Sequence, residues 1–431
     1  MKKHYGAFVL EKEEKVYIYN PYVDLGVWVD KEKTLEETLE VNKSCLFEKN
    51  IFMDEASGRK LHTFFVNKER YNFSEVTVTE AMSFACNLKC VYCMQQNTEH
   101  KVNEISAEER VKLWKKLLEI FGAERLNICL FGGEPFLKID YIEQLMVLAK
   151  ENNIEIGRLF AVTNGTLCND RIMTFINQYG LSSVQVTLDG PAEVHNKRRV
   201  GKEKNTYEII NNNIQRLLDE TDVKIVINTV LDKQNHEYYE EMLDELIVKY
   251  GDYMYGEKTR IIFNLGVECH PVNKSEYTDE NILEEKEYRD FFYDNMMKLA
   301  NKGVAINMPF PAPVCILNYA NDIVTGPDGS VYSCITAIGM EKFRIGTYEE
   351  VMNKTENFLM NSIITSERER GEGCKTCDYL PFCNGGCAYN QVTEEKKSSC
   401  QKLLFDLTIE KQIELKSMLE EIGPGIYRKV S

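Results

Sequence analysis

The chain alternates between short apolar runs and amphipathic stretches from residue 75 to about residue 300. The apolar runs are rich in Val, Ile, Thr and Phe, which favour strands. Between them, apolar residues recur three and four positions apart, and that spacing predicts helices. The predicted strands are Val76–Thr79, Leu126–Phe131, Leu159–Thr163, Val184–Leu188, Lys224–Val230 and Arg260–Asn264. The predicted helices are Ala107–Phe121, Ile139–Asn152, Asp170–Gln178, Tyr207–Leu218, Glu237–Val248 and Glu284–Leu299.

Six strand–helix repeats predict an α/β fold with a parallel sheet, because parallel neighbours are joined by helical crossovers. A curved sheet of six such units would be a partial β/α barrel. An open, doubly wound sheet would show the same alternation, so the pattern alone leaves both architectures open.

The alternation stops at both ends of the chain. The N-terminal segment has strand-like Lys15–Tyr19 and Val27–Val29 and a helical Thr34–Val41, which predict a small α+β extension. The segment after the last repeat is dense in Cys, Gly and Pro, so we expect a weak apolar core that needs metal. The expected parts are residues 1–74, 75–304, 305–400 and a C-terminal helix in 401–431.

Charge and cysteine usage narrow the class of protein. The net charge of −16 argues against a general nucleic-acid binder and against binding to an anionic membrane surface. The apolar run Ala7–Leu10 is too short for a signal peptide, and no window approaches a membrane-spanning length. We therefore expect a cytoplasmic protein, in which 14 cysteines bind metal more readily than they form disulfides.

Three cysteines follow the first predicted strand directly. Cys86, Cys90 and Cys93 form a C-x3-C-x2-C run, and thiolates favour zinc, Cu(I) or iron–sulfur clusters. A structural zinc needs four ligands, and no fourth Cys or His is close in sequence. Three ligands suit a four-iron cluster with one open iron, and loops after barrel strands build active sites.

The other strand ends carry polar and glycine residues that fit a bound ligand. Glycines allow close backbone approach, a glutamate can accept from an ammonium group, and Asp or Arg can hold hydroxyls or a carboxylate. Each residue alone is weak evidence for a ligand site, but all of them fall at the carboxyl ends of predicted strands. They are Gly132, Gly133 and Glu134, then Thr163–Thr166, and finally Thr187, Asp189, His195, Arg198 and Arg199.

Together, the cysteine run with Tyr92 before its last cysteine and the sequence Gly132–Pro135 resemble the motifs of radical S-adenosylmethionine (SAM) enzymes. The resemblance covers about residues 76–300. It implies a partial (β/α)6 TIM barrel in which Cys86, Cys90 and Cys93 hold a catalytic [4Fe-4S] cluster that binds SAM.

The resemblance also implies the chemistry and the SAM contacts. A reductant such as flavodoxin or ferredoxin would supply one electron, and cleavage of SAM would release a 5′-deoxyadenosyl radical that abstracts hydrogen from the substrate. Gly132, Gly133 and Glu134 would meet the methionyl ammonium group. Thr187 and Asp189 would lie near the ribose, and Arg199 near the methionyl carboxylate.

A second group of cysteines lies near the C-terminus. A zinc ribbon is the simplest reading of four of them, but seven cysteines exceed one zinc site. Their order resembles the SPASM domain of radical SAM peptide maturases. That resemblance implies two auxiliary [4Fe-4S] clusters, one held by Cys374, Cys377, Cys383 and Cys400 and one by Cys315, Cys334 and Cys387.

The second auxiliary cluster is one cysteine short. Cys45, Cys129, Cys168 and Cys269 remain, and we expect Cys129 and Cys168 to be core thiols. The fourth position is an open iron, Cys269 or a non-cysteine ligand. We expect an open iron that binds a substrate thiolate; loss of that cluster in Cys269→Ala would contradict this.

SPASM enzymes mostly modify peptides, so the leading expectation is a radical SAM oxidoreductase that forms a thioether or carbon–carbon crosslink in a ribosomally made precursor peptide. The alternatives are a dehydrogenase of the sulfatase-maturase type, another protein or small-molecule oxidase, and a non-catalytic electron-transfer protein. Sulfatase maturases carry an Asp directly after the cysteine of Gly-x4-Cys, where this chain has Ile335. Residues 1–74 are either a leader-peptide-binding domain or a structural cap.

Overall fold

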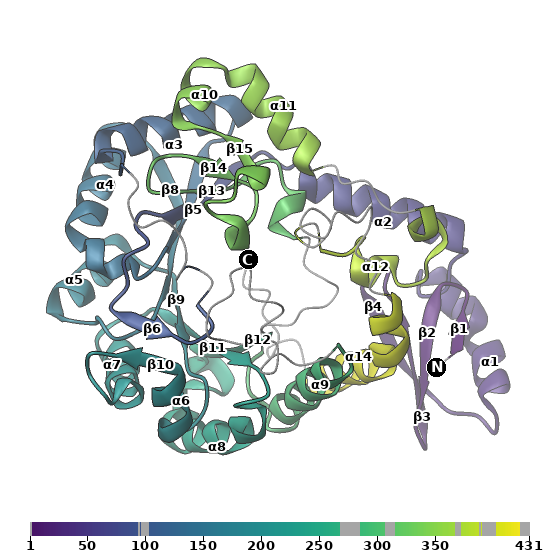
Figure 1. Ribbon diagram of the computed structural model, residues 1–431. Helices are drawn as coiled ribbons and strands as arrows, with labels where there is room; N and C mark the ends of the chain where they lie inside the picture. The colour runs from purple at the N-terminus through teal and green to yellow at the C-terminus, as the bar shows by residue number, and fades with distance from the viewer. Residues whose placement is uncertain are drawn as a thin grey trace. The chain divides into compact units, whose positions relative to one another are not determined.

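The computed structural model describes residues 2–93, 95, 103–267, 285–306, 315–366, 372–387, 389 and 402–422 (Figure 1). The chain divides into two compact units, each considered by itself. The sheet unit contains Tyr71–Glu284 and Ile316–Arg368, and the terminal unit contains Met1–Arg70, Glu285–Cys315 and Glu369–Ser431. Among the described helices, none is long and apolar enough to cross a membrane.

The sheet unit is built on a nine-stranded sheet in the order β12-β11-β9-β8-β7-β5-β13-β14-β15. Neighbours from β12 to β13 run parallel, whereas β14 and β15 are antiparallel additions at one edge. The strands are β5 (Glu75–Ala81), β7 (Arg125–Phe131), β8 (Glu155–Thr163), β9 (Ser183–Thr187), β11 (Lys224–Leu231), β12 (Ile261–Val267), β13 (Asp322–Thr325), β14 (Val331–Tyr332) and β15 (Arg344–Gly346).

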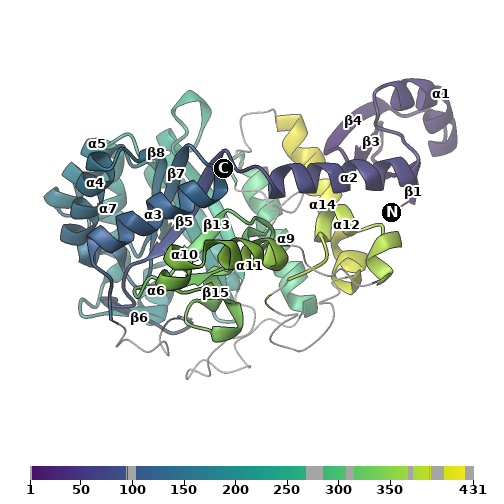
Figure 2. The same cartoon turned by 90° about the horizontal axis from the view of Figure 1, so that it is seen from above.

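Helices connect the parallel strands and pack along the outer side of the curved sheet (Figure 1). Residues at the helix ends determine where the helices begin and end. In α3 (Ala107–Phe121), Ser106 and Glu109 form a capping box at the start, and Gly122 ends the helix with φ +65°. Near the end of this unit, α10 contacts α3 (Figure 2). The helices are α3 (Ala107–Phe121), α4 (Ile139–Glu151), α5 (Asp170–Tyr179), α6 (Ala192–Arg198), α7 (Thr206–Glu220), α8 (Tyr239–Tyr250), α10 (Tyr348–Asn353) and α11 (Thr355–Ser366).

A buried ion pair joins β5, α3 and β13. The Nη1 of Arg110 lies 2.8 Å from Oε2 of Glu80, and both side chains are at most 1% exposed. The Thr325 hydroxyl donates to the same carboxylate oxygen over 2.6 Å, and the Trp114 indole N–H donates to the other. Because the buried carboxylate has several donors, its desolvation is offset. The pair therefore attaches β13 to the parallel sheet.

The terminal unit contains a four-stranded antiparallel sheet that is covered on both faces. One face packs on α1, and the other packs on α12 and α14. Its elements are β1 (Lys2–His4), β2 (Ala7–Glu11), β3 (Lys15–Asn20), β4 (Leu25–Asp30), α1 (Leu35–Glu48), α2 (Glu55–Arg70), α9 (Glu285–Asn301), α12 (Leu380–Cys383) and α14 (Lys402–Ile422).

The structure confirms the predicted α/β class, and each of the six predicted strands and the six crossover helices overlaps an observed element. The N-terminal segment was under-predicted, because it has four strands and two helices. Alternating residues of β2 are buried on opposite faces, Val9 against α1 and Phe8 against α12, so the strand lacks polar alternation. The helix α11 was also missed: Ser362 and Ser366 are buried while Met360 and Ile364 are exposed, the reverse of the usual pattern.

Candidate functional site

The first cysteine cluster lies on a loop at the carboxyl end of β5. The short strand β6 (Leu88–Cys90) pairs with β10 (Arg199–Gly201), and this ladder fixes the loop. Cys86 is exposed, Cys93 is partly buried, and Cys90 is buried opposite Arg199. The backbone N–H of Cys93 donates to the carbonyl of Cys90, which turns the chain between these two thiols.

The donors around these thiols fit an iron–sulfur ligand set. The Leu88 N–H lies 3.4 Å from the Cys86 sulfur, and the Asn164 amide nitrogen lies 3.7 Å from it. Such donors stabilise a thiolate that binds iron. Burial raises the pKa of the Cys90 thiol to about 11, and the nearby Arg199 guanidinium opposes that rise. Within the described residues, no three Cys, His, Asp or Glu side chains are grouped as ligands of one metal ion.

The Gly132–Gly133 turn packs directly on the cysteine loop. The N–H of Gly133 donates to the Ser83 carbonyl over 3.0 Å, and that of Glu134 donates to the Ala85 carbonyl over 2.9 Å. A Cβ at Gly132, whose φ is +123°, would lie 2.4 Å from the Ser83 oxygen; one at Gly133 would lie 2.3 Å from the Ala85 oxygen. The glycines are therefore required by this backbone contact.

Glu134 connects this turn to the loop after β8. Its carboxylate accepts from the Thr163 hydroxyl over 2.8 Å and from the Asn164 N–H over 2.7 Å, and it is 1% exposed. It also accepts from the Phe136 N–H. Burial raises the pKa of this carboxyl, while the three donors lower it. Asn164 in turn donates to Asn87 over 2.8 Å, so the residues predicted at three strand ends form one hydrogen-bonded group.

Tyr92, Asp189 and Arg199 also meet. The Tyr92 hydroxyl donates to Asp189 and accepts from Nη1 of Arg199 over 2.8 Å. Asp189 is fully buried, and its second oxygen accepts from the Val230 N–H over 3.0 Å. In this arrangement both carboxylate oxygens already have protein donors. Their roles toward ribose and toward a methionyl carboxylate stay predictions.

His195 and Arg198 support this network. The N–H of Asp189 donates to Nδ1 of His195, which is fully buried, and burial lowers the pKa of that imidazole. Arg198 lies over the Tyr92 ring at 5.0 Å and pairs with Asp232 over 2.6 Å. His195 therefore holds the backbone of Asp189 in place, and Arg198 holds the ring of Tyr92.

Two asparagines that the sequence analysis did not single out lie beside Thr187. In the parallel register Thr187 is opposite Asn228, which is opposite Asn264, so the three side chains share one face. The Asn264 amide donates to Oδ1 of Asn228 over 2.6 Å. Single asparagines inside otherwise apolar strands were the available signal.

The C-terminal cysteines fall in both units. Cys334 is buried two residues after the end of β14, and Ile335 packs against an apolar group that includes Phe84 of the cysteine loop. The carbonyls of Cys377 and Thr376 accept from Arg59. Predicted ligands with partly buried side chains in the terminal unit are Cys315, Cys374, Cys377, Cys383 and Cys387. Cys400 and Cys269 lie outside the described residues.

The unassigned cysteines behave as expected where they are described. Cys129 and Cys168 are each 4% exposed, which confirms that they are core residues. Cys45 is exposed on α1.

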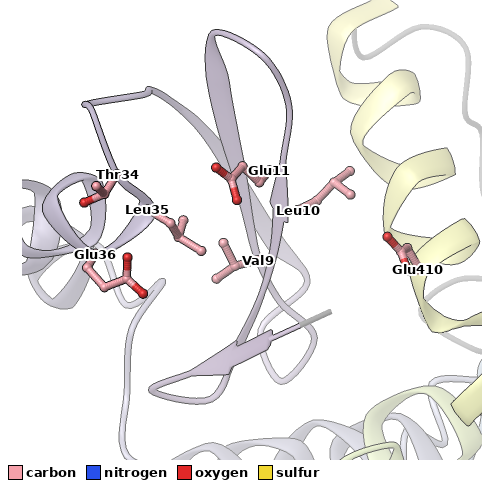
Figure 3. A pocket seen from close by; sticks show the side chains of 7 residues that line it. All are labelled: Val9, Leu10, Glu11, Thr34, Leu35, Glu36 and Glu410. Atoms are coloured by element: carbon pink, nitrogen blue, oxygen red, sulfur yellow. The ribbon is translucent and has the colours of Figure 1, made fainter.

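The terminal unit has a hollow of about 450 Å³ between β2, the start of α1 and α14 (Figure 3). Apolar side chains of Val9, Leu10 and Leu35 line it, and its acidic residues are Glu11, Glu36 and Glu410. Among the described strands, β1 and β4 each have a single partner, so both are sheet edges.

Comparison with known proteins agrees with this geometry. Residues 81–246 match the Radical SAM superfamily. A cysteine-type anaerobic sulfatase-maturating enzyme of Clostridium novyi is 27% identical over 339 residues, which are 71% of this chain and 86% of the relative.

Two solved structures share the fold. One, native anSMEcpe with bound AdoMet and Cp18Cys peptide, has a TM-score of 0.61 at 21% identity and covers 81% of this chain and 99% of its own. The other, Streptococcus suis SuiB bound to precursor peptide SuiA, has a TM-score of 0.54 at 14% identity. The match covers 92% of this chain and 97% of the SuiB chain. The chain contains a radical SAM domain, and these two structures share its fold.

Proposed function

We propose that this protein is a cytoplasmic radical SAM maturase that installs a thioether or carbon–carbon crosslink in a ribosomally made peptide. The observation that carries the proposal is the cysteine loop after β5, whose backbone is bonded to the Gly132–Glu134 turn within a matched radical SAM domain. A four-iron cluster and SAM held there would supply radical chemistry for removing a hydrogen atom from a substrate carbon.

The chain's own residues would hold and orient these groups. Cys86, Cys90 and Cys93 would ligate the cluster, and the sulfur of Cys86 keeps its two N–H donors. Gly132, Gly133 and Glu134 would lie at the methionyl ammonium, where the second lone pairs of the carboxylate remain for acceptance. Thr187, Asp189 and Arg199 would border the ribose and carboxylate. The neighbouring Asn228 and Asn264 would line the same face.

The C-terminal cysteines would hold auxiliary clusters, and the terminal unit would bind the peptide. We assign Cys374, Cys377, Cys383 and Cys400 to one cluster, and Cys315, Cys334 and Cys387 to another with an open iron. The hollow beside β2 has an apolar floor and three glutamates, so it suits a leader peptide with apolar and basic residues. Pairing with an edge strand would give such a peptide backbone hydrogen bonds.

Oxidation of the sulfatase-maturase type is the second candidate, and the similarity to the Clostridium novyi relative favours it to the same extent. One local feature favours crosslinking. Ile335 occupies the position where sulfatase maturases have an aspartate, and it is packed among apolar residues that include Phe84 and Tyr332. No carboxylate base is provided at that position.

The test uses the full chain, reconstituted anaerobically with iron and sulfide. With SAM and dithionite we expect 5′-deoxyadenosine, and a variant with all three loop cysteines changed to Ala should produce none. If the wild type produced no 5′-deoxyadenosine, the proposal that the protein is an enzyme would be contradicted.

A second step separates the two candidates. A peptide encoded by a short reading frame beside the gene should lose two hydrogen atoms, and fragmentation should skip the looped segment. An oxidised peptide that fragments throughout its length would favour the sulfatase-maturase type of reaction.

A further inference from the structure

The β6–β10 ladder has two different faces. Its register pairs Cys90 with Arg199, both buried, and Lys89 with Val200, both exposed. Val200 is 45% exposed, which is unusual for a strand residue next to a buried arginine. Successive residues of a strand point to opposite sides. A molecule seated on the exposed side would therefore be separated from the predicted cluster ligand Cys90 by one residue.

Exposed lysines precede and follow β10 in the sequence. Lys197 lies in the last turn of α6, which leads into β10, and Lys202 and Lys204 follow β10 in sequence; all three are exposed. Together with Lys89 and Val200 they form what we call the lysine face. In the described part of the chain, none of these four lysines forms an ion pair.

This face is cationic in an acidic protein. Residues 193–204 contain Lys197, Lys202 and Lys204 against Glu193 and Glu203, and Lys89 of β6 adds to this local positive excess, whereas the chain as a whole carries −16. Lysines without acidic partners on such a background form a distinct positive area, which attracts an anionic partner from a distance.

A hollow at the Leu88–Gly201 end of the ladder shares Lys202 with the lysine face. It has a volume of about 220 Å³ and extends from Asn87 and Leu88 of the cysteine loop to Lys202 and Glu203, with Ile209 of α7 in its wall. The cationic area thus has an apolar depression beside it, which suits a protein surface better than a free ion.

We propose that the lysine face is the docking surface of an acidic one-electron carrier protein. This inference rests on the proposed function, because only a cluster at Cys86, Cys90 and Cys93 would need the electron. On docking, the carrier is oxidised by one electron and the cluster is reduced by one; no bond forms or breaks. The lysines attract the acidic carrier, and Val200 with the hollow supplies the apolar contact.

The test uses the reconstituted full chain with an acidic flavodoxin as the probe. The double variant Lys202→Glu/Lys204→Glu reverses two charges outside the cysteine loop, and Lys112→Glu/Lys115→Glu on α3 makes the same charge change at two other exposed lysines. Binding of flavodoxin, measured by calorimetry at low salt, should weaken at least tenfold in the first variant and much less in the control. The difference should shrink as salt is raised.

Activity provides a second readout. With reduced flavodoxin as donor, formation of 5′-deoxyadenosine should fall in the first variant, whereas with dithionite it should match that of the wild type. Unchanged flavodoxin affinity, equal weakening in the control, or an equal loss with dithionite would each overturn the docking surface. Failure of the wild type to cleave SAM with dithionite would instead contradict the proposed function, and the binding comparison would still test the lysine face.

Discussion

At the scale of single residues, the Gly132–Gly133 turn has a structural role besides any contact with SAM. Neither position has room for a Cβ, because the carbonyl oxygens of Ser83 and Ala85 already occupy that space. These carbonyls accept hydrogen bonds from the turn itself. The glycines thus shape the loop that carries Cys86.

Gly133→Ala should disturb that loop. The added methyl group would force the Ala85 carbonyl away, and overpacking of this kind costs about 1–3 kcal/mol. We expect a lower thermal unfolding midpoint and reduced iron in the site after reconstitution, measured by calorimetry and by iron analysis.

Gly251→Ala provides the matched control, since the nearest atom to its Cβ would be 4.0 Å away. It should retain wild-type stability and iron content. If Gly133→Ala behaved like this control, the contact with the Ala85 carbonyl would not be needed.

At the scale of elements, the Glu80–Arg110 pair joins three of them. Glu80→Gln should leave the Arg110 charge buried without its counterion, at a cost of about 3–5 kcal/mol. The double variant Glu80→Gln/Arg110→Met should recover much of that loss, because no unpaired charge remains. Urea unfolding of the wild type, the single variants Glu80→Gln and Arg110→Met, and the double variant measures the coupling, and additive losses would argue against a coupled pair.

The strand β13 also contains a carboxyl group in an unfavourable setting. Burial raises the pKa of Asp322 to about 7, and one of its oxygens is enclosed without a hydrogen-bond partner. The unfolded chain loses this proton near pH 4, so the free energy of unfolding should fall as pH rises from about 4 to 7.

Asp322→Asn should remove that pH dependence. The difference in free energy of unfolding between the variant and the wild type should be more favourable to the variant at pH 8 than at pH 4, by on the order of 2–4 kcal/mol. Urea unfolding at both pH values measures the change, with the exposed Asp252→Asn as control. Equal effects of the two substitutions would exclude Asp322 as the cause.

Much of the fold was predictable because the spacing of apolar residues reveals which helices and strands bury only one face. The predicted helix Ala107–Phe121 matches α3 at both ends, where caps mark the termini. The strand β2 was not predictable in this way, since both of its faces are buried.

The site residues were predictable by type and by position at strand ends, but their partners were not. Nothing in the local sequence indicated that Asp189 would meet Tyr92, 97 residues earlier in the chain. Asn228 and Asn264 become a pair only through the parallel register of β11 and β12.

For the whole molecule, the cysteine assignment predicts a metal content. Three [4Fe-4S] clusters require about 12 iron atoms per chain, and a variant with Cys86, Cys90 and Cys93 changed to Ala should keep about 8. Iron analysis with electron paramagnetic resonance of the reduced protein measures both. A wild-type content near 4 would contradict the auxiliary clusters.

The addition of β13 beside β5 has a consequence for the order of events during synthesis. Thr325 bonds to Glu80 across 245 residues, so β5 gains its second neighbour only after most of the chain has left the ribosome. Until then the strand that leads into the first cysteines has an open edge, and Arg110 lacks the carbonyls of residues 326 and 327. Contacts between such distant positions form late and slowly. We therefore predict that the loop after β5 reaches its final form, and with it the proposed site for a cluster, only after β13 has been made.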